Sequence, residues 1–336
     1  MFISWNTTVR TRFTSAGVRT RYLNMRHLLG LKNMSAAELQ SLLDTALAFR
    51  EIVDRPVKKV PTLRGKAVIT LFYENSTRTR TSFEMAAKIM SAEAINIAVG
   101  QSSVAKGESL KDTLQTLQSL RADCIVIRHP MSGSAEFAAN ILHIPVINAG
   151  DGRHEHPTQG LLDMLTIRQA KGDLSGLVVS IVGDITHSRV ARSNIWGLTA
   201  MGASVRLVGP PTLMPADAEK LPVTVHSNLL EGLEGADVVN VLRLQTERQE
   251  AGLLPSLREY SRLFGINHKS LACAKPDVLV LHPGPMNRGV EISSEVADGK
   301  YGLHSAMEEQ VTNGIAVRMA ALYTLMGANI PPVVDA

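Results

Sequence analysis

The sequence predicts an α/β protein of two doubly wound domains, each built around a central, mainly parallel sheet. Its 336 residues are too many for one ordinary domain, and a hydrophobic content of 45% is enough for two cores. Short apolar runs alternate with segments of helical periodicity along most of the chain. Near-continuous apolar strands that alternate with helices are typical of parallel sheets covered on both faces.

Eight strands are expected, in two groups of about four. Each is a short apolar run bounded by polar residues or by glycine and proline. The first group comprises residues 66–73, 94–99, 124–128 and 144–148, and the second comprises residues 177–182, 204–208, 237–242 and 277–281.

Helices are expected between these strands, and the first follows Ser35, a residue type that caps helix N-termini. The predicted helices are residues 35–50, 82–91, 109–120, 158–171, 188–201 and 311–326. The first domain is predicted to span residues 25–158 and to be completed by the C-terminal helix, residues 310–330. The second domain is predicted to span residues 159–309.

The basic net charge belongs to the N-terminal segment. Residues 1–24 contain four arginines and no Asp, Glu or Lys, so they account for the whole net charge of +4. The remaining residues sum to zero, and the pI of 9.1 therefore gives no indication of a nucleic-acid partner. Residues 1–24 fit an organellar transit peptide, and they also fit an upstream start codon or a disordered extension. We favour the second interpretation, with folding beginning near Met25.

Composition also bears on the compartment of the protein. No apolar run approaches the roughly 20 residues that a membrane span needs, so we expect no membrane partner. Two cysteines, Cys124 and Cys273, are too few for a disulfide framework and suit a reducing cytosol. The expected location is cytoplasmic.

Polar segments follow six of the predicted strands. In open parallel sheets, ligands bind beyond the carboxyl ends of the strands, so these segments are expected to meet in an active-site cleft between the domains. They are residues 74–80, 128–130, 151–159, 183–189, 243–245 and 282–288.

The run Ser76-Thr77-Arg78-Thr79-Arg80 lies between the first strand and a helix. A helix N-terminus offers unpaired N–H groups and the positive end of the helix dipole, and hydroxyls add further donors. Two arginines oppose the dipole there unless an anion is bound. The run therefore predicts a phosphate site rather than a simple helix cap.

No Gly-x-x-x-x-Gly-Lys-[Ser/Thr] or Gly-x-Gly-x-x-Gly motif occurs in the chain, so the phosphate is expected on a small molecule. The segment Val182-Gly183-Asp184 opens the second domain and suggests, as an alternative, a nucleotide-dependent oxidoreductase. The missing glycine fingerprint argues against that alternative.

A second polar constellation is His154-Glu155-His156-Pro157-Thr158-Gln159. Two histidines two residues apart could form a metal pair, but no matching cluster completes such a site, and Pro157 indicates the first turn of a helix. We interpret His156 as a donor that polarises a carbonyl group and Gln159 as a side chain that recognises an amide. No metal is expected.

Arg189 and Arg243 follow strands of the second domain. Two arginines in one cleft can each bind one carboxylate of a small dicarboxylate through paired hydrogen bonds. Surface ion pairs would explain either arginine alone, but the position of both at strand ends favours the binding role.

These residues resemble one family. Phe72, Glu74 and residues 76–80 are similar to the carbamoyl-phosphate signature of the aspartate and ornithine carbamoyltransferases, and residues 156–159 to their second shared motif. The resemblance runs from about Met25 to the C-terminal helix. It implies transfer of a carbamoyl group from carbamoyl phosphate to an amino group, without a cofactor.

The second domain favours L-aspartate as the acceptor, which implies a step of de novo pyrimidine (UMP) biosynthesis. Residues 243–248 resemble the aspartate-binding stretch, and residues 282–285 lack the cysteine of the His-Cys-Leu-Pro motif of ornithine enzymes. Their Ser-Met-Gly triplet is also absent from the sequence. Two arginines would repel the ammonium of protonated ornithine. Another carbamoyltransferase, for ornithine or an acylated relative, is the alternative within the family.

The resemblance assigns a role to each site residue. It gives catalysis to Arg78, Thr79, Arg128 and His156. It gives carbamoyl-phosphate binding to Ser76, Thr77, Arg78, Thr79, Arg128, His156, Gln159, Gly284 and Pro285. It gives aspartate binding to Lys106, Arg189, Arg243 and Gln245.

The resemblance also implies a homotrimer with shared active sites, in which Lys106 acts in a neighbouring subunit. Either Ser102 or Ser103 would accompany Lys106, and the spacing favours Ser102. Whether regulatory chains bind the trimer is left open.

Overall fold

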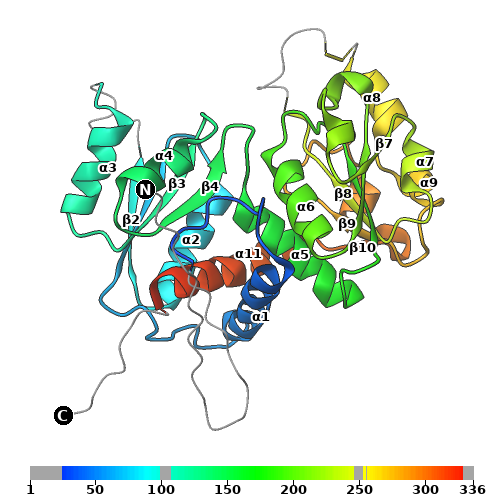
Figure 1. Cartoon of the computed structure of the whole chain (residues 1–336). Helices are drawn as coiled ribbons and strands as arrows, with labels where there is room; N and C mark the ends of the chain where they lie inside the picture. Colours follow the sequence, from blue (N-terminus) through cyan, green and yellow to red (C-terminus); the bar gives the residue numbers. More distant parts are fainter. Residues whose placement is uncertain (1–24, 99–106, 246–252, 255, 328–336) are drawn as a thin grey trace.

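The computed structural model describes residues 25–98, 107–245, 253–254 and 256–327. They form two α/β halves, each with its own sheet (Figure 1). The first sheet is parallel throughout, with strand order β2-β1-β3-β4. Its strands are β1 (Ala67–Phe72), β2 (Glu93–Ala98), β3 (Cys124–His129) and β4 (Val146–Asp151).

Helices cover both faces of the first sheet. Alternate strand residues, such as Ile69 and Ile125, pack with the helices of one face, while Val68 and Val126 pack with those of the other. The first face carries α3 (Leu110–Ser119) and α4 (Ser134–Ile141), and the second carries α1 (Ala36–Val53) and α2 (Thr77–Ile89).

The second sheet has six parallel strands in the order β10-β9-β8-β5-β6-β7. They are β5 (Val178–Val182), β6 (Ser204–Val208), β7 (Thr224–His226), β8 (Val238–Val241), β9 (Leu279–Leu281) and β10 (His304–Ser305). One face packs against α6 (Arg189–Ala200). The other packs against α7 (Leu229–Leu233), α8 (Leu257–Phe264), α9 (His268–Leu271) and α10 (Ser294–Ala297).

The predicted fold class is confirmed, and all eight predicted strands are present. The expectation of about four strands in the second group was too low, because β7 and β10 add one strand at each edge of the sheet. Both are only two or three residues long, and no apolar run marks them in the sequence. β4 ends at Asp151, three residues beyond its prediction, because Gly150 and Asp151 continue the strand without apolar side chains.

Helix starts follow their capping residues. Ser35 caps α1 in a capping box with Glu38, as its position predicts. α2 begins at Thr77 rather than at residue 82, since Ser76 is its cap and the first turn is polar. The C-terminal helix α11 (Met307–Leu322) also begins earlier than predicted and continues as a π-helical turn, Tyr323–Gly327.

The two halves share one hydrophobic core, which continues through α5 (Pro157–Lys171) and α11. Every residue of α5 from 157 to 167 is buried, so this helix has no solvent face over three turns. α11 packs against α1, α5 and α2 (Figure 1). The polar residues at the start of α5 therefore lie where the two halves meet.

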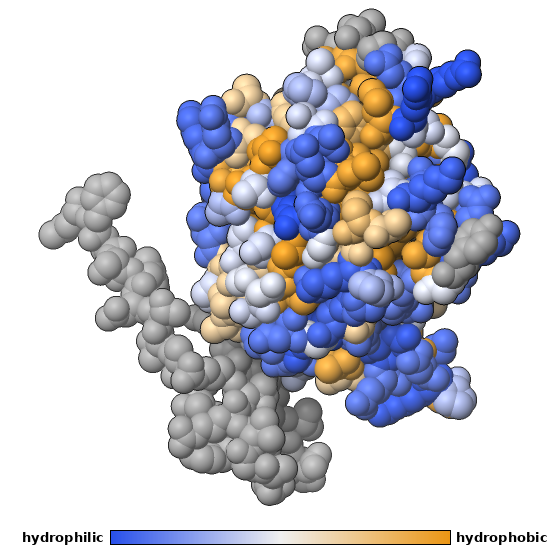
Figure 2. Space-filling view, turned by 90° about the vertical axis from the view of Figure 1, so that its right-hand side faces the viewer, coloured by the Kyte–Doolittle hydropathy of each residue, from blue (hydrophilic) through white to orange (hydrophobic). Residues whose placement is uncertain are grey.

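The outer surface contrasts with this core. Figure 2 shows hydrophilic and hydrophobic residues interspersed on the face that it presents. None of the helices in the described ranges combines the length and the apolar character that a membrane span requires.

Glu155, just before α5, connects Leu31 and Lys32, which precede α1, to α6 of the second half. Its buried carboxylate accepts hydrogen bonds from the backbone N–H groups of Leu31 (2.7 Å) and Lys32 (3.2 Å) and from the hydroxyl of Ser193 on α6 (2.9 Å). The Glu155 side chain also lies so close to Gly30 that a Cβ there would overlap it.

We expect Glu155→Ala to lower the free energy of unfolding by about 3 kcal/mol, because it leaves three donors without their acceptor. Urea denaturation followed by circular dichroism measures this. Glu38→Ala is the matched control, since it removes an exposed capping carboxylate that contributes about 1 kcal/mol or less. Equal losses in the two variants would contradict the structural role of Glu155.

Candidate active site

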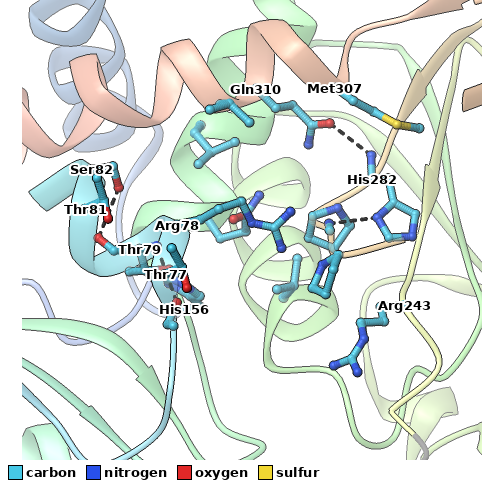
Figure 3. Close-up of a pocket in the computed structure, with 18 of the residues that line it drawn as sticks. Thr77, Arg78, Thr79, Thr81, Ser82, His156, Arg243, His282, Met307 and Gln310 are labelled. Atoms are coloured by element: carbon cyan, nitrogen blue, oxygen red, sulfur yellow. Dashed lines mark hydrogen bonds between the residues drawn. The ribbon is translucent and has the colours of Figure 1, made fainter. Parts of the chain in front are cut away.

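A cavity of about 1150 Å³ lies between the two halves (Figure 3). Every predicted site residue in the described part of the chain lines it. From the first half and α5 come Ser76, Thr77, Arg78, Thr79, Arg128, His156 and Gln159, and from the second half come Arg189, Arg243, Gln245, Gly284 and Pro285. Lys106, Ser102 and Ser103 lie outside the described residues.

The N-terminus of α2 forms one wall of the cavity. The Ser76 hydroxyl accepts a hydrogen bond from the Thr79 N–H (3.3 Å), and the first turn contains no acidic residue. Arg78 extends from this turn toward the second half (Figure 3). Partial burial, together with repulsion by Arg243, lowers the pKa of its guanidinium. Arg80 is exposed and is not part of the cavity wall.

Glu74 joins arginines of the two halves at the cavity wall. Its Oε2 accepts a hydrogen bond from Arg189 Nη2 (2.6 Å) and lies 3.3 Å from Arg128 Nε. Arg128 also donates to the Ala149 carbonyl (3.2 Å), and Arg189, which is buried, donates to the Gly152 carbonyl (3.4 Å). One carboxylate thus positions two guanidinium groups that belong to different halves, Arg128 on β3 and Arg189 at the start of α6.

His156 and His154 lie in opposite electrostatic surroundings. His156 is buried at the N-terminus of α5, and its pKa is well below the ordinary value because of burial and the nearby Arg128, Arg189 and Arg318. No hydrogen-bond partner for its Nδ1 occurs in the described part of the chain. The His154 ring instead contacts Asp151 (3.1 Å), and this hydrogen bond raises its pKa.

The Gln159 side chain has a fixed orientation. Its Nε2 donates to Asp163 Oδ1 (2.9 Å), one turn further along α5, which leaves its Oε1 as an acceptor. Asp163 is fully buried and also accepts hydrogen bonds from Asn194 (2.7 Å) and Gln310 (2.7 Å). Burial raises the pKa of Asp163 to about 6, against the opposing effect of these amide donors.

The sequence of each half matches a family domain. Residues 26–169 match the carbamoyl-P binding domain of aspartate/ornithine carbamoyltransferase, and residues 175–325 match its Asp/Orn binding domain. The chain belongs to the aspartate/ornithine carbamoyltransferase family.

Individual carbamoyltransferases resemble the whole chain. The catalytic subunits named aspartate carbamoyltransferase from Desulforamulus reducens and Pelotomaculum thermopropionicum are 61% and 60% identical to it. Each alignment covers 90% of this chain, and 96% and 97% of the respective relative.

Solved structures of the family share the fold. Aspartate transcarbamoylase from Trypanosoma cruzi, in complex with carbamoyl phosphate and aspartate, superposes with a TM-score of 0.80. It is 30% identical, over 90% of this chain and 97% of that one. Ornithine carbamoyltransferase from Pyrococcus furiosus gives a TM-score of 0.78 at 28% identity, over 91% and 98% of the two chains.

Arg318 is a cavity residue of this carbamoyltransferase that sequence reasoning missed. It is buried on α11, donates to the Gly314 carbonyl (2.7 Å) and stands 5.2 Å from the centre of the Phe83 ring. Burial and the nearby Arg78 lower its pKa to about 9. The sequence feature that could have identified it is a single arginine within the apolar run of residues 315–322. A charged side chain there needs a specific reason to be buried.

At pH 6.5 we expect the His154 ring to be more than half protonated and the His156 ring to be neutral. His154 therefore adds stability below its unfolded pKa, and this is lost as pH rises through its raised folded pKa. His156 has the opposite effect: stability is lost as pH falls below about 6.5, because only the unfolded chain then takes up a proton on this residue. ¹⁵N NMR titration, assigned with His154→Gln and His156→Gln, measures both, and a protonated His156 at pH 6.5 would contradict the expectation.

Proposed function

We propose that the chain transfers the carbamoyl group of carbamoyl phosphate to the amino group of L-aspartate, giving N-carbamoyl-L-aspartate and phosphate in de novo pyrimidine (UMP) biosynthesis. The observation that carries the proposal is the single cavity in which the α2 N-terminus and neutral His156 face Arg189 and Arg243 of the second half. The names of the two relatives described above support it, as do the ligands of the Trypanosoma cruzi structure.

In this proposal the phosphate group binds at the start of α2. The unpaired N–H groups of the first turn and the positive end of the helix dipole stabilise its negative charge. Ser76, Thr77 and Thr79 add hydroxyl donors, and Arg78 adds a planar guanidinium that matches two phosphate oxygens. Residues 25–158, completed by the C-terminal helix of residues 310–330, are thus the carbamoyl-phosphate-binding domain.

The carbonyl oxygen of carbamoyl phosphate is polarised by Thr79, Arg128 and His156. A neutral imidazole can donate one N–H to this oxygen without taking up a proton, and its low pKa keeps it in that form. Gln159 accepts a hydrogen bond from the carbamoyl NH₂ through Oε1, the atom that its contact with Asp163 leaves available. The backbone carbonyls of Gly284 and Pro285 accept from the carbamoyl and attacking amino groups.

Aspartate binds to the second domain, residues 159–309. Arg189 and Arg243 hold its two carboxylates, Gln245 adds a polar contact, and Lys106 reaches the site from a neighbouring subunit. Support for Arg189 is its preset orientation, since Glu74 and the Gly152 carbonyl fix its guanidinium. A carboxylate that arrives there needs little reorganisation of the protein.

Catalysis then rests on positioning and electrostatics. The aspartate nitrogen attacks the carbonyl carbon and loses a proton, a tetrahedral oxyanion forms, and the C–O bond to phosphate breaks, without a covalent enzyme intermediate. Well-oriented reactants can lower the barrier by roughly 7–11 kcal/mol. Arginines around the cavity stabilise the charge of the oxyanion and of the departing phosphate.

We infer a homotrimer with shared active sites from the family resemblance, with Lys106 reaching the site of a neighbouring subunit. We also infer a cytoplasmic location, supported by the two free thiols of Cys124 and Cys273.

The acceptor is tested by incubating the purified chain with carbamoyl phosphate and aspartate, ornithine or acetylornithine, and measuring carbamoylated product and phosphate. We expect turnover with aspartate as the acceptor and none with ornithine or acetylornithine. Arg78→Ala is expected to lower kcat/KM by about 10²–10³-fold, because it removes charge stabilisation at the leaving group. Turnover with ornithine and none with aspartate would contradict the proposal.

The shared site is tested by mixing Arg78→Ala and Lys106→Ala subunits after reversible dissociation. Each variant alone is expected to be nearly inactive. Random reassembly restores both residues in roughly one quarter of the sites, so about that fraction of wild-type activity should return. Unmixed variants carried through the same treatment are the control, and no recovery would count against Lys106 acting in the neighbouring site.

A further inference from the structure

His282 lies in the cavity wall directly after β9, and both of its ring nitrogens contact other groups of the protein. Its Nδ1 lies 2.7 Å from the backbone nitrogen of Gly284, and its Nε2 lies 3.2 Å from Oε1 of Glu291. The side chains of His282 and Glu291 are both fully buried. The imidazole therefore links a buried carboxylate to the backbone of the Gly284–Pro285 turn.

These two contacts fix the tautomer of His282. The Gly284 N–H is a donor, so Nδ1 must present its lone pair, and the single proton of a neutral ring is then on Nε2, where Glu291 accepts it. Glu291 Oε1 also accepts the N–H of Asn287 (2.5 Å), which holds the carboxylate in place. Burial lowers the pKa of His282 despite the opposing effect of Glu291, and Arg78 and Arg243 lower it further, so the ring remains neutral.

The turn that His282 holds lies against the phosphate-binding wall of the other half. Gly284 has a φ of +57°, and a Cβ at this position would overlap the Arg78 guanidinium. The Gly284 backbone therefore contacts Arg78 directly, and only glycine permits both this conformation and this approach. A shift of the turn would alter the distance between its carbonyls and any ligand on Arg78.

The backbone of His282 is anchored as well. Its N–H donates to Gln310 Oε1 (2.9 Å; Figure 3). Gln310 Nε2 in turn donates to Asp163, the same carboxylate that orients Gln159. A continuous set of hydrogen bonds thus runs from Gln159 to Gly284. The groups expected to contact the two sides of the carbamoyl group are held in one network.

We propose that His282 is a positioning residue for carbamoyl transfer, which acts by holding the Gly284 N–H on Nδ1 and so directs the carbonyls of Gly284 and Pro285 at the reacting groups. This inference rests on the proposed function. His282 acts through the turn, since neither of its ring nitrogens is left to contact a substrate. Its contribution is therefore to geometry at the moment of attack, where a displacement of about 1 Å costs about 10²-fold in rate.

Two substitutions separate this role from simple packing. In His282→Asn the side-chain oxygen lies near the position of Nδ1 and can accept the Gly284 N–H. In His282→Gln the polar end lies near the position of Nε2, and that acceptor is lost. We expect His282→Asn to keep kcat within about threefold of wild type, and His282→Gln to lower kcat by about 10–100-fold with KM for carbamoyl phosphate changed less than threefold.

If His282 only filled space, His282→Asn would be the more damaging substitution, because Asn leaves the larger void. Equal kcat values in the two variants, or a lower value for Asn, would overturn the role of His282 while leaving the proposed function intact. Absence of carbamoyl transfer by the wild-type chain would overturn the proposed function and this role with it.

A second measurement does not depend on activity or on the folding of a variant. ¹⁵N NMR of the wild-type chain should show His282 protonated on Nε2 alone, and the Gly284 amide should be protected from hydrogen exchange. Where they fold, His282→Asn should retain this protection and His282→Gln should lose it. A proton on Nδ1, or an unprotected Gly284 amide in the wild type, would overturn the inference.

Discussion

The contact of Glu74 with Arg128 and Arg189 is the interaction on which the arrangement of the cavity depends. Among the described residues, five arginines line this space: Arg78, Arg128, Arg189, Arg243 and Arg318. Their like charges would otherwise drive the two halves apart. A carboxylate placed between the two halves offsets part of that repulsion and orients two of the guanidinium groups. The remaining positive potential is what an anionic ligand would experience on entering.

Burial decides what each polar group near this cavity can do. His154 and His156 belong to the same short motif, yet a neighbouring carboxylate favours the charged form of one and burial favours the neutral form of the other. Asp163 is buried among amide donors rather than cations, so it orients side chains without neutralising any arginine. The chemistry available at the site thus follows from which groups the shared core covers.

The sequence was sufficient for the fold class and for the cavity residues that follow strands, because both depend on local pattern. Parallel strands give near-continuous apolar runs, and their carboxyl ends must lie along one edge, so the polar segments after them could be grouped in advance. The edge strands β7 and β10 could not be predicted, since pairing with a neighbour rather than composition defines them. Arg318 and Asp163 were missed for a similar reason: each lies within a helix whose other residues read as core.

The close approach of Gly284 to Arg78 also constrains how this chain can change. The two residues are far apart in sequence and lie in different halves, but no side chain can be added at Gly284 unless the guanidinium of Arg78 moves away. A larger residue at Gly284 therefore requires a different conformation of the Arg78 side chain, and a graft of one half onto a foreign partner would have to preserve this fit. For protein engineering, the residues allowed at a turn of one domain thus depend on a side chain of the other.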